Sequence, residues 1–131
     1  MHLSLSDLPG LMAVQHKVLK ALKQETGLRQ RDWEVLCACQ RLSLLKYPFT
    51  VSKIDAYLSG AYFLPCLYDS LRVLLEKHYL KVVVPGKPFR PESYENTYKG
   101  TALVRDKMDE MRRLMERQDE GIAGKHTSRI W

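Results

Sequence analysis

The sequence lacks the features that mark membrane and secreted proteins. It holds no apolar run of about 18 residues or more, so we expect no membrane-spanning helix and no membrane partner. Residues 1–10 contain neither a basic start nor an apolar core, and we therefore expect no signal peptide. The three cysteines are an odd number and lie in apolar stretches, which favours reduced thiols in a cytoplasmic protein.

Residues of the kind that catalyse reactions or hold metals are scattered. Four histidines lie far apart along the chain, at His2, His16, His78 and His126. No His-x-x-x-His motif, no paired carboxylate beside them and no glycine-rich phosphate loop is present. Cys37 and Cys39 are two residues apart, which places them on nearly opposite faces of a helix and disfavours a metal site. Cys66 fits an inert core thiol better than a redox sensor. We therefore expect a protein that is not an enzyme and needs no metal or cofactor.

The composition suits a single folded domain over residues 1–131. The chain is 45% hydrophobic and 27% charged, which is ordinary for a globular protein and sufficient to bury a core. The formal net charge is +6, and the larger share of the excess lies after residue 76. A mild basic excess favours nucleic acid or an acidic surface as the partner, although ordinary basic proteins without such partners are about as common.

Hydrophobic periodicity predicts four helices before residue 79. They cover residues 7–23, residues 30–45, a short stretch from Thr50 or Ser52 to Leu58, and residues 63–78. Gly27 is a candidate C-terminal cap of the first helix, and Ser52 with Asp55 has capping-box spacing for the third. Ser59 and Gly60 separate the third helix from the fourth by a short turn, which is the pattern of a helix-turn-helix.

The remainder of the chain predicts a hairpin and a long helix. Residues 79–84 are a β-branched run typical of a strand, and residues 93–97 can return as a second strand. Three prolines and a glycine in residues 85–91 predict a stiff, extended tip between them, so the hairpin has the form of a wing. Residues 98–118 have helical periodicity, and residues 119–131 predict a loose tail. The helix carries apolar residues spaced by four, three and four: Val104, Met108, Met111 and Met115.

This order of elements resembles that of the MarR family, the multiple-antibiotic-resistance regulators. Four local stretches resemble the family's second helix, its helix-turn-helix, the end of its recognition helix and the start of its dimerisation helix: Leu28–Leu36, Thr50–Ile54, Leu71–Leu80 and Thr97–Leu103. The resemblance covers about residues 8–118. It implies a mainly α fold with a small β-hairpin (α+β), in which a winged helix-turn-helix lobe over residues 28–97 stands between dimerisation helices at 7–24 and 98–118.

The resemblance also implies a sequence-specific regulator of transcription, acting as a repressor, that binds double-stranded DNA as a homodimer. The helix over residues 63–78 would enter the major groove, and the wing would follow the adjacent minor groove or backbone. Candidate DNA-binding residues are Ser52, Lys53, Tyr62, Tyr68, Asp69, Arg72, Lys81, Lys87 and Arg90. Each of them also fits an ordinary solvated surface position. Candidate dimerisation residues are Leu8, Leu11, Met12, Val104, Met108, Met111 and Met115. The alternative for these apolar stripes is that they pack on each other within one subunit.

Two stretches depart from the family's pattern. The recognition helix begins with an apolar, aromatic run over residues 61–66, where the family has a small or polar residue. Arg90 matches the family's wing arginine, but Pro88 and Phe89 precede it and the acidic partner is missing. Phe89 is then either an anchor onto the domain or part of a contact surface.

These departures leave two other functions open. The first is a winged-helix protein-interaction module that docks a protein on Tyr62, Phe63 and Leu64. The second is a DNA-binding accessory protein of a mobile element. A regulator of this kind could also respond to a small-molecule effector held between the dimerisation helices and the DNA-binding lobe. Its chemistry is unknown, and candidate lining residues are Met12, Trp33 and Tyr47.

Overall fold

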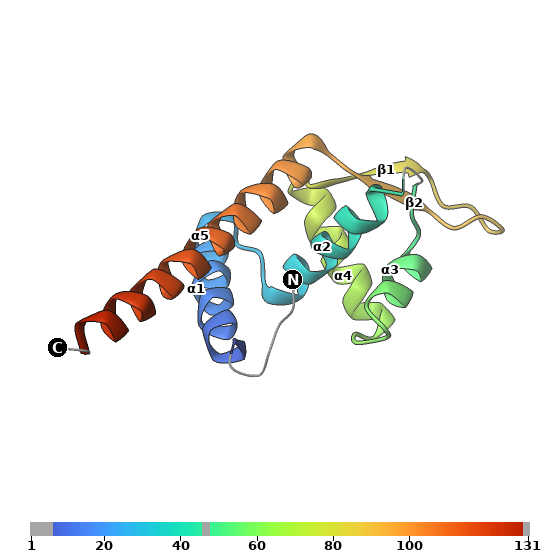
Figure 1. Cartoon of the computed structure of the whole chain (residues 1–131). Coiled ribbons are helices and arrows are strands. Elements are labelled where there is room, and N and C mark those ends of the chain that lie inside the picture. The colour runs from blue at the N-terminus through green and yellow to red at the C-terminus, as the bar shows by residue number, and fades with distance from the viewer. Residues whose placement is uncertain (1–6, 46–47, 130–131) are drawn as a thin grey trace. The chain divides into compact units, whose positions relative to one another are not determined.

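The computed structural model describes residues 7–45 and 48–129, with side chains up to residue 120. The elements are, in order, α1 (Leu8–Thr26), α2 (Gln30–Ser43), α3 (Val51–Tyr57), α4 (Leu64–Glu76), β1 (Leu80–Val84), β2 (Ser93–Asn96) and α5 (Tyr98–Arg129) (Figure 1). The predicted mainly α fold with a small antiparallel hairpin is confirmed. None of the described helices is long and apolar enough to cross a membrane.

The chain forms two compact units. One comprises α1 together with α5 from Asp106 onwards, and the other comprises Leu28–Arg105. The second unit holds the helix-turn-helix and the hairpin, and it therefore contains all the residues predicted to bind DNA. Tyr47 and the last two residues of the predicted tail lie outside the described residues.

In the first unit, α1 and α5 run antiparallel. Lys107 Nζ lies 2.7 Å from Glu25 Oε2 near one end of the pair, and Gln118 Nε2 donates to the Gly10 carbonyl at 3.1 Å near the other. α1 buries residues four apart, Val14, Val18 and Leu22. It ends as predicted at Gly27, whose φ of 77° is readily reached only without a Cβ atom.

Helix α5 continues to Arg129, past the predicted end at residue 118. The prediction of a loose tail from residue 119 was based on two glycines and small polar residues. A glycine inside a helix costs only about 1 kcal/mol relative to alanine, and no proline interrupts the segment. The helix therefore persists where composition alone favoured an end.

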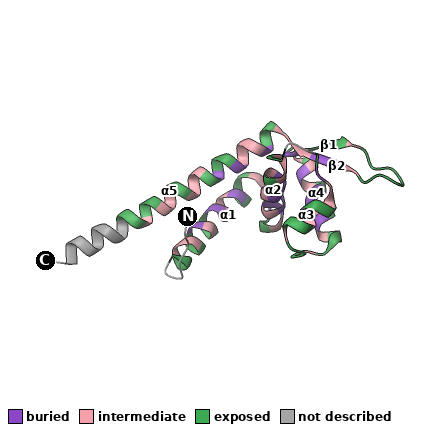
Figure 2. Cartoon of the chain, turned by 45° about the vertical axis from the view of Figure 1, so that its right-hand side comes forward, coloured by how far each residue is buried: buried purple, intermediate pink, exposed green. Residues whose placement is uncertain are grey.

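In the second unit, α2 is the central helix, with α3, α4 and β2 packed against it. It buries a broad face that includes Trp33, Val35, Leu36 and Cys39, whereas α3 contributes Ile54 to the core. Burial is concentrated in α2 and α4, and the far end of the hairpin is exposed throughout (Figure 2). The core thus sits behind the helix-turn-helix and leaves the wing tip free.

The helix-turn-helix forms between α3 and α4. Ser59 and Gly60 both have positive φ, at 54° and 68°, and make the turn between the two helices. The predicted capping box of Ser52 with Asp55 was wrong, because α3 begins at Val51 and Ser52 lies inside it. Thr50 is the N-cap instead, without a side-chain hydrogen bond.

The hairpin pairs β1 with β2 in antiparallel register, with Val82 opposite Tyr94 and an irregularity between Val82 and Val84. Phe49 extends this small sheet through two backbone hydrogen bonds with Tyr94, of 3.0 and 2.8 Å. The hairpin is therefore tied to the chain segment just before α3. This connection positions the wing beside the helix-turn-helix.

Where β2 gives way to α5, Gly100 permits a close approach of two backbones. A Cβ atom at this position would lie 2.2 Å from the Tyr79 carbonyl oxygen, so no other residue fits without a shift. Thr97 caps the start of α5, because its hydroxyl accepts from the Gly100 N–H at 3.1 Å and donates to the His78 carbonyl at 2.6 Å.

Candidate nucleic-acid interface

The outer face of α4 changes character along its length. Leu64 and Tyr68, near the start of the helix, are 50% and 54% exposed. Arg72 and Glu76, towards its end, are also exposed and form an ion pair of 3.1 Å with each other. Leu67, Leu71 and Leu74 face the core as predicted. The helix that would enter a DNA groove is thus apolar at its beginning and charged, but paired, at its end.

Asp69 accepts hydrogen bonds from three arginines. Its carboxylate lies 2.7 Å from Arg29, 2.6 Å from Arg31 and 2.7 Å from Arg72. The hydrogen bonds from Arg29 and then Arg72 lower the pKa of Asp69 to about 2. Asp69, a predicted DNA-binding residue, therefore serves inside the protein as an anion that holds guanidinium groups.

Asp32 and Ser70 extend this network into the core. Ser70 Oγ donates to Asp32 Oδ1 at 2.7 Å and accepts from Arg31 Nε at 2.9 Å. Asp32 also accepts from the backbone N–H and the guanidinium of Arg29. Burial by itself would raise the pKa of Asp32, but the hydrogen bonds from Arg29 and Ser70 outweigh it and lower that pKa.

This network, hereafter the arginine cluster, consists of Arg29, Arg31, Arg72, Asp32, Ser70, Asp69 and Glu76. Its three positive side chains are balanced by three carboxylates. Arg72 is therefore engaged by the protein's own carboxylates. Sequence analysis missed Arg29 and Arg31, although the spacing of Arg29 and Asp32 at a helix start was a usable local signal.

Tyr62 directs its hydroxyl to the protein as well. The hydroxyl donates to the Glu34 carboxylate on α2, and this hydrogen bond is the main reason that the pKa of Tyr62 is raised to about 12. Tyr68 has no such partner among the described residues and is exposed. Of the two predicted tyrosines, Tyr68 is the one whose hydroxyl is available to a ligand.

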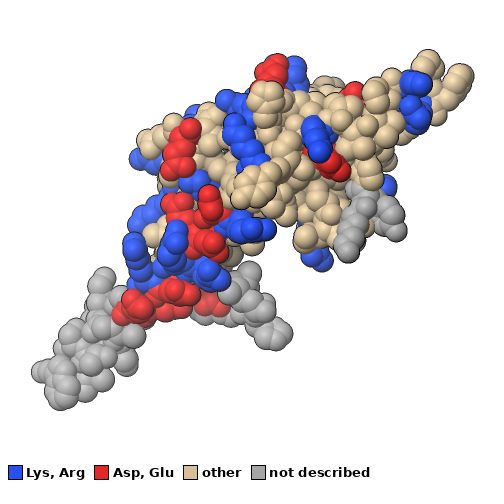
Figure 3. Space-filling model, turned by 90° about the horizontal axis from the view of Figure 1, so that it is seen from above, with Lys and Arg blue, Asp and Glu red and all other residues tan. Residues whose placement is uncertain are grey.

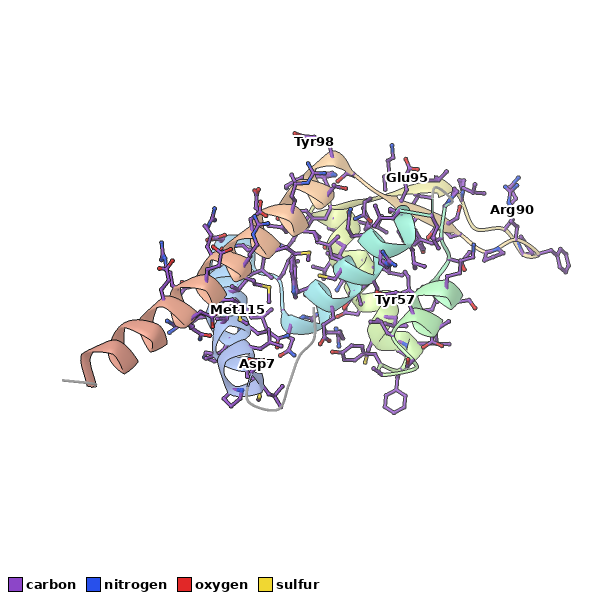
Figure 4. The ribbon with its side chains drawn as sticks, viewed as in Figure 1. Asp7, Tyr57, Arg90, Glu95, Tyr98 and Met115 are labelled. Atoms are coloured by element: carbon purple, nitrogen blue, oxygen red, sulfur yellow. The ribbon has the colours of Figure 1, made fainter. Side chains whose placement is uncertain are left out.

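The wing carries two cations, Lys87 and Arg90, at its tip. Lys81, near the base, pairs with Glu95 across the strands at 2.8 Å. The side chains of Lys87 and Arg90 make no ion pair or hydrogen bond within the described residues and are exposed. Figure 4 shows Arg90 at the outer end of the hairpin, and Figure 3 shows blue atoms there among uncharged ones, whereas red and blue alternate along α5.

On α3, Ser52 and Lys53 are both exposed, and Lys53 likewise lacks an ion-pair partner within the described residues. The predicted candidates therefore separate into two groups. One group forms ion pairs or hydrogen bonds with other side chains of the protein: Asp69, Arg72, Tyr62 and Lys81. Ser52, Lys53, Tyr68, Lys87 and Arg90 are open to solvent.

A pocket of about 400 Å³ lies between the helix-turn-helix and the hairpin. It is lined by Thr50, Val51, Ser52, Asp55, Leu64, Tyr68, Pro91, Glu92 and Tyr94. The Tyr94 hydroxyl donates to Glu92 at 2.7 Å, and burial followed by this bond raises the pKa of Tyr94. With Asp55 and Glu92 in its wall, the pocket carries negative rather than positive charge.

The predicted dimerisation residues differ in exposure. Leu8, Met12 and Met108 are 47%, 59% and 59% exposed. Leu11, Met111 and Met115 are partly buried, and Val104 is 4% exposed and so already covered within the single chain. Of the predicted effector-lining residues, Trp33 is buried in the core.

The cysteines are poor candidates for chemistry. Burial raises the pKa of Cys37 to about 12 and raises that of Cys39 further, so both are held as thiols. Cys66 is a free thiol of intermediate exposure. Within the described residues, no group of three or more histidine, cysteine or acidic side chains could hold a metal ion.

Solved structures share this arrangement of elements across nearly the whole chain. MepR, a transcription regulator of the Staphylococcus aureus multidrug efflux pump MepA, is 15% identical, with a TM-score of 0.66 over 98% of this chain and 97% of its own. A S. aureus MepR mutant bound to an oligodeoxyribonucleotide is 19% identical, with a TM-score of 0.64 over 98% and 97%. NadR in complex with 4-hydroxyphenylacetate is 11% identical, with a TM-score of 0.62 over 98% and 88%.

The chain has the fold of the MarR family. In this MarR fold, α3 and α4 form the helix-turn-helix and β1 with β2 forms the wing. The resemblance inferred from the sequence is therefore confirmed for the fold. No protein-family profile matches the sequence, and no curated protein matches it either.

Proposed function

We propose that this protein is a regulator of transcription that binds double-stranded DNA in a sequence-specific manner, as a homodimer, and represses its target. The observation that carries the proposal is a wing tip on a MarR fold with two cations, Lys87 and Arg90, that have no ion-pair partner among the described residues. The MepR mutant bound to an oligodeoxyribonucleotide supports DNA as the partner of such a fold. In this arrangement α4 enters the major groove while the wing follows the neighbouring minor groove.

In this proposal, some exposed groups contact phosphates and others contact base edges. Lys53 on α3 and the two wing cations would neutralise phosphates, which supplies affinity without sequence information. Tyr68 lies on the face of α4 that would meet base edges. Arg72 would contact a guanine edge after giving up its ion pair with Asp69. The arginine cluster holds α4 against the start of α2, so this face is presented on a stiff support.

The homodimer follows from exposed apolar side chains in the first unit. Leu8, Met12 and Met108 lie on α1 and α5 and are about half exposed. Burying them against a second copy is favourable, and two-fold symmetry would then present two α4 helices to adjacent half-sites. The complex of NadR with 4-hydroxyphenylacetate supports a further possibility for the fold, namely control by a small-molecule effector.

The test is binding to random-sequence duplex DNA, measured by fluorescence anisotropy across a salt series. We expect affinity that falls steeply with salt. Replacing Lys87 and Arg90 by alanine should reduce the slope of log affinity against log salt by about two, because each phosphate contact contributes about one. Replacing Lys20 and Lys23, exposed on α1, removes the same charge and should leave the slope nearly unchanged. Absence of binding even at low salt would overturn the proposal.

A second candidate function is docking of a protein. Phe63 is 84% exposed at the start of α4, beside the half-exposed Leu64 and Tyr68 and the negatively charged pocket. Exposed apolar clusters of this kind commonly mark interaction sites. If this function holds, Phe63→Asp abolishes capture of a partner in a pull-down, and the wild-type protein shows no salt-dependent binding of DNA. Salt-dependent binding of duplex DNA favours the regulator.

A further inference from the structure

The tip of the wing is a small closed turn in its own right. The Lys87 N–H donates to the Arg90 carbonyl at 2.8 Å, and the Arg90 N–H donates back at 3.0 Å. Pro88 and Phe89 form the two-residue connection between them, and proline has a fixed φ at such a position. The reciprocal hydrogen bonds and the proline ring therefore hold Phe89 at the outermost point of the hairpin.

Phe89 is fully exposed. Its exposure is 103%, so the described part of the chain leaves its side chain uncovered. The alternative that it anchors the wing onto the domain is therefore wrong. A large apolar ring that a stiff turn holds in water is unusual, because phenylalanine is among the residues most often buried. The ring is free to be covered by a partner.

The charges beside Phe89 indicate what that partner is. Lys87 and Arg90 lie opposite each other across the turn, directly before Pro88 and directly after Phe89, and neither pairs with a carboxylate within the described residues. A complementary surface must offer an apolar slot between two rows of negative charge. The minor groove of DNA does so, because base pairs stack between two phosphate backbones about 6 Å apart.

We propose that Phe89 inserts between two base pairs from the minor groove and kinks the duplex, while Lys87 and Arg90 contact the phosphates on either side. This inference rests on the proposed DNA-binding function and assigns the wing a specific mode of contact. Apolar wedges of this kind partly unstack a base step and bend DNA. Because pyrimidine–purine steps unstack most easily, the wing would favour TA or CA/TG steps at its contact position without hydrogen-bonding a base.

The experiment uses duplexes that the wild-type full chain selects from a random library, labelled at their ends for energy transfer. Binding of the wild type should shorten the end-to-end distance, whereas Phe89→Ala should bind about tenfold more weakly without bending the DNA. Phe89→Leu, which keeps an apolar wedge, should retain part of the bend. Lys87→Ala with Arg90→Ala should lower the salt slope. Because the described part of the chain leaves Phe89 uncovered, the melting curve of Phe89→Ala should match that of the wild type.

The outcomes separate this inference from the proposed function. If the wild type selects no DNA, or binds vesicles of anionic lipid instead, the DNA-binding function fails and the inference fails with it. If wild type and Phe89→Ala bind and bend DNA equally, the function stands and the wedge is overturned. A fluorescence rise of 2-aminopurine placed at the preferred step, seen with the wild type and lost in Phe89→Ala, supports the wedge directly.

Discussion

At the scale of single residues, Asp69 is the carboxylate that pairs with three arginines. Its carboxylate binds three guanidinium groups and so neutralises part of their positive charge. It therefore holds α4 in place and at the same time reduces the positive potential of the proposed DNA-binding face. These two effects have opposite consequences for stability and for DNA binding, and they can be separated by substitution.

Asp69→Asn should increase affinity for random duplex DNA at low salt, because it removes the carboxylate that Arg29, Arg31 and Arg72 share and raises the net charge by one. Asp109→Asn is the matched control, since Asp109 pairs with Arg112 at 3.0 Å on α5 and its loss changes the net charge equally. Fluorescence anisotropy measures both variants. Equal gains in the two variants would show that only net charge matters.

The lowered pKa of Asp69 predicts how the stability of the protein depends on pH. The pKa of Asp69 is lowered from 3.8 to about 2, and that of Asp32 is lowered as well. Between about pH 4 and about pH 2 the unfolded chain therefore binds more protons than the folded chain. The contribution of these carboxylates to the free energy of unfolding is complete above about pH 4 and is lost as the pH falls towards about 2. The urea midpoint should decrease over this interval. In Asp69→Asn the decrease should be smaller, and an identical decrease would contradict the assignment.

At the scale of elements, the junction of the wing with α5 depends on one glycine. Gly100→Ala places a Cβ atom 2.2 Å from the Tyr79 carbonyl oxygen, and relieving that overlap requires the backbone to move. We expect a loss of about 1–3 kcal/mol of unfolding free energy, the usual cost of overpacking. Thermal or urea unfolding measures it.

Gly10→Ala is the control for that substitution. Its Cβ atom would meet only the end of the Gln118 side chain, which can turn away. Alanine also has a higher helix propensity than glycine, so stability should be unchanged or should rise by up to about 1 kcal/mol. A similar loss in both variants would mean that the contact with Tyr79 is not the cause.

At the scale of the whole molecule, the proposed dimer depends on the exposed apolar side chains of α1 and α5. Met12→Glu with Met108→Glu places charges on two side chains that are each 59% exposed, and it should yield monomers in sedimentation. Leu44→Glu with Leu45→Glu is a matched control, because these residues are 60% and 62% exposed but lie at the end of α2. Dimers that persist in the first variant would refute the assigned surface.

The sequence by itself determined the order of the elements, because the signals involved are local. Leucines three and four residues apart predict the face that α4 buries, and three prolines in residues 85–91 predict a stiff wing tip. Helix ends were less accurate. Ser52 was predicted to cap α3, but Thr50 is its N-cap. Helix α5 continues past the glycines that indicated its end.

Only the tertiary structure decided which charged groups are free. The sequence predicted Asp69 and Arg72 to contact DNA. In the structure Asp69 also binds Arg29 and Arg31, which lie some 40 residues earlier in the chain. Lys87 and Arg90 are also cations, yet they have no ion-pair partner in the described part of the chain, and Phe89 between them is exposed. A residue's type depends on the sequence alone. Its partners depend on which distant segments the packing of α2 against α4 brings within hydrogen-bonding distance.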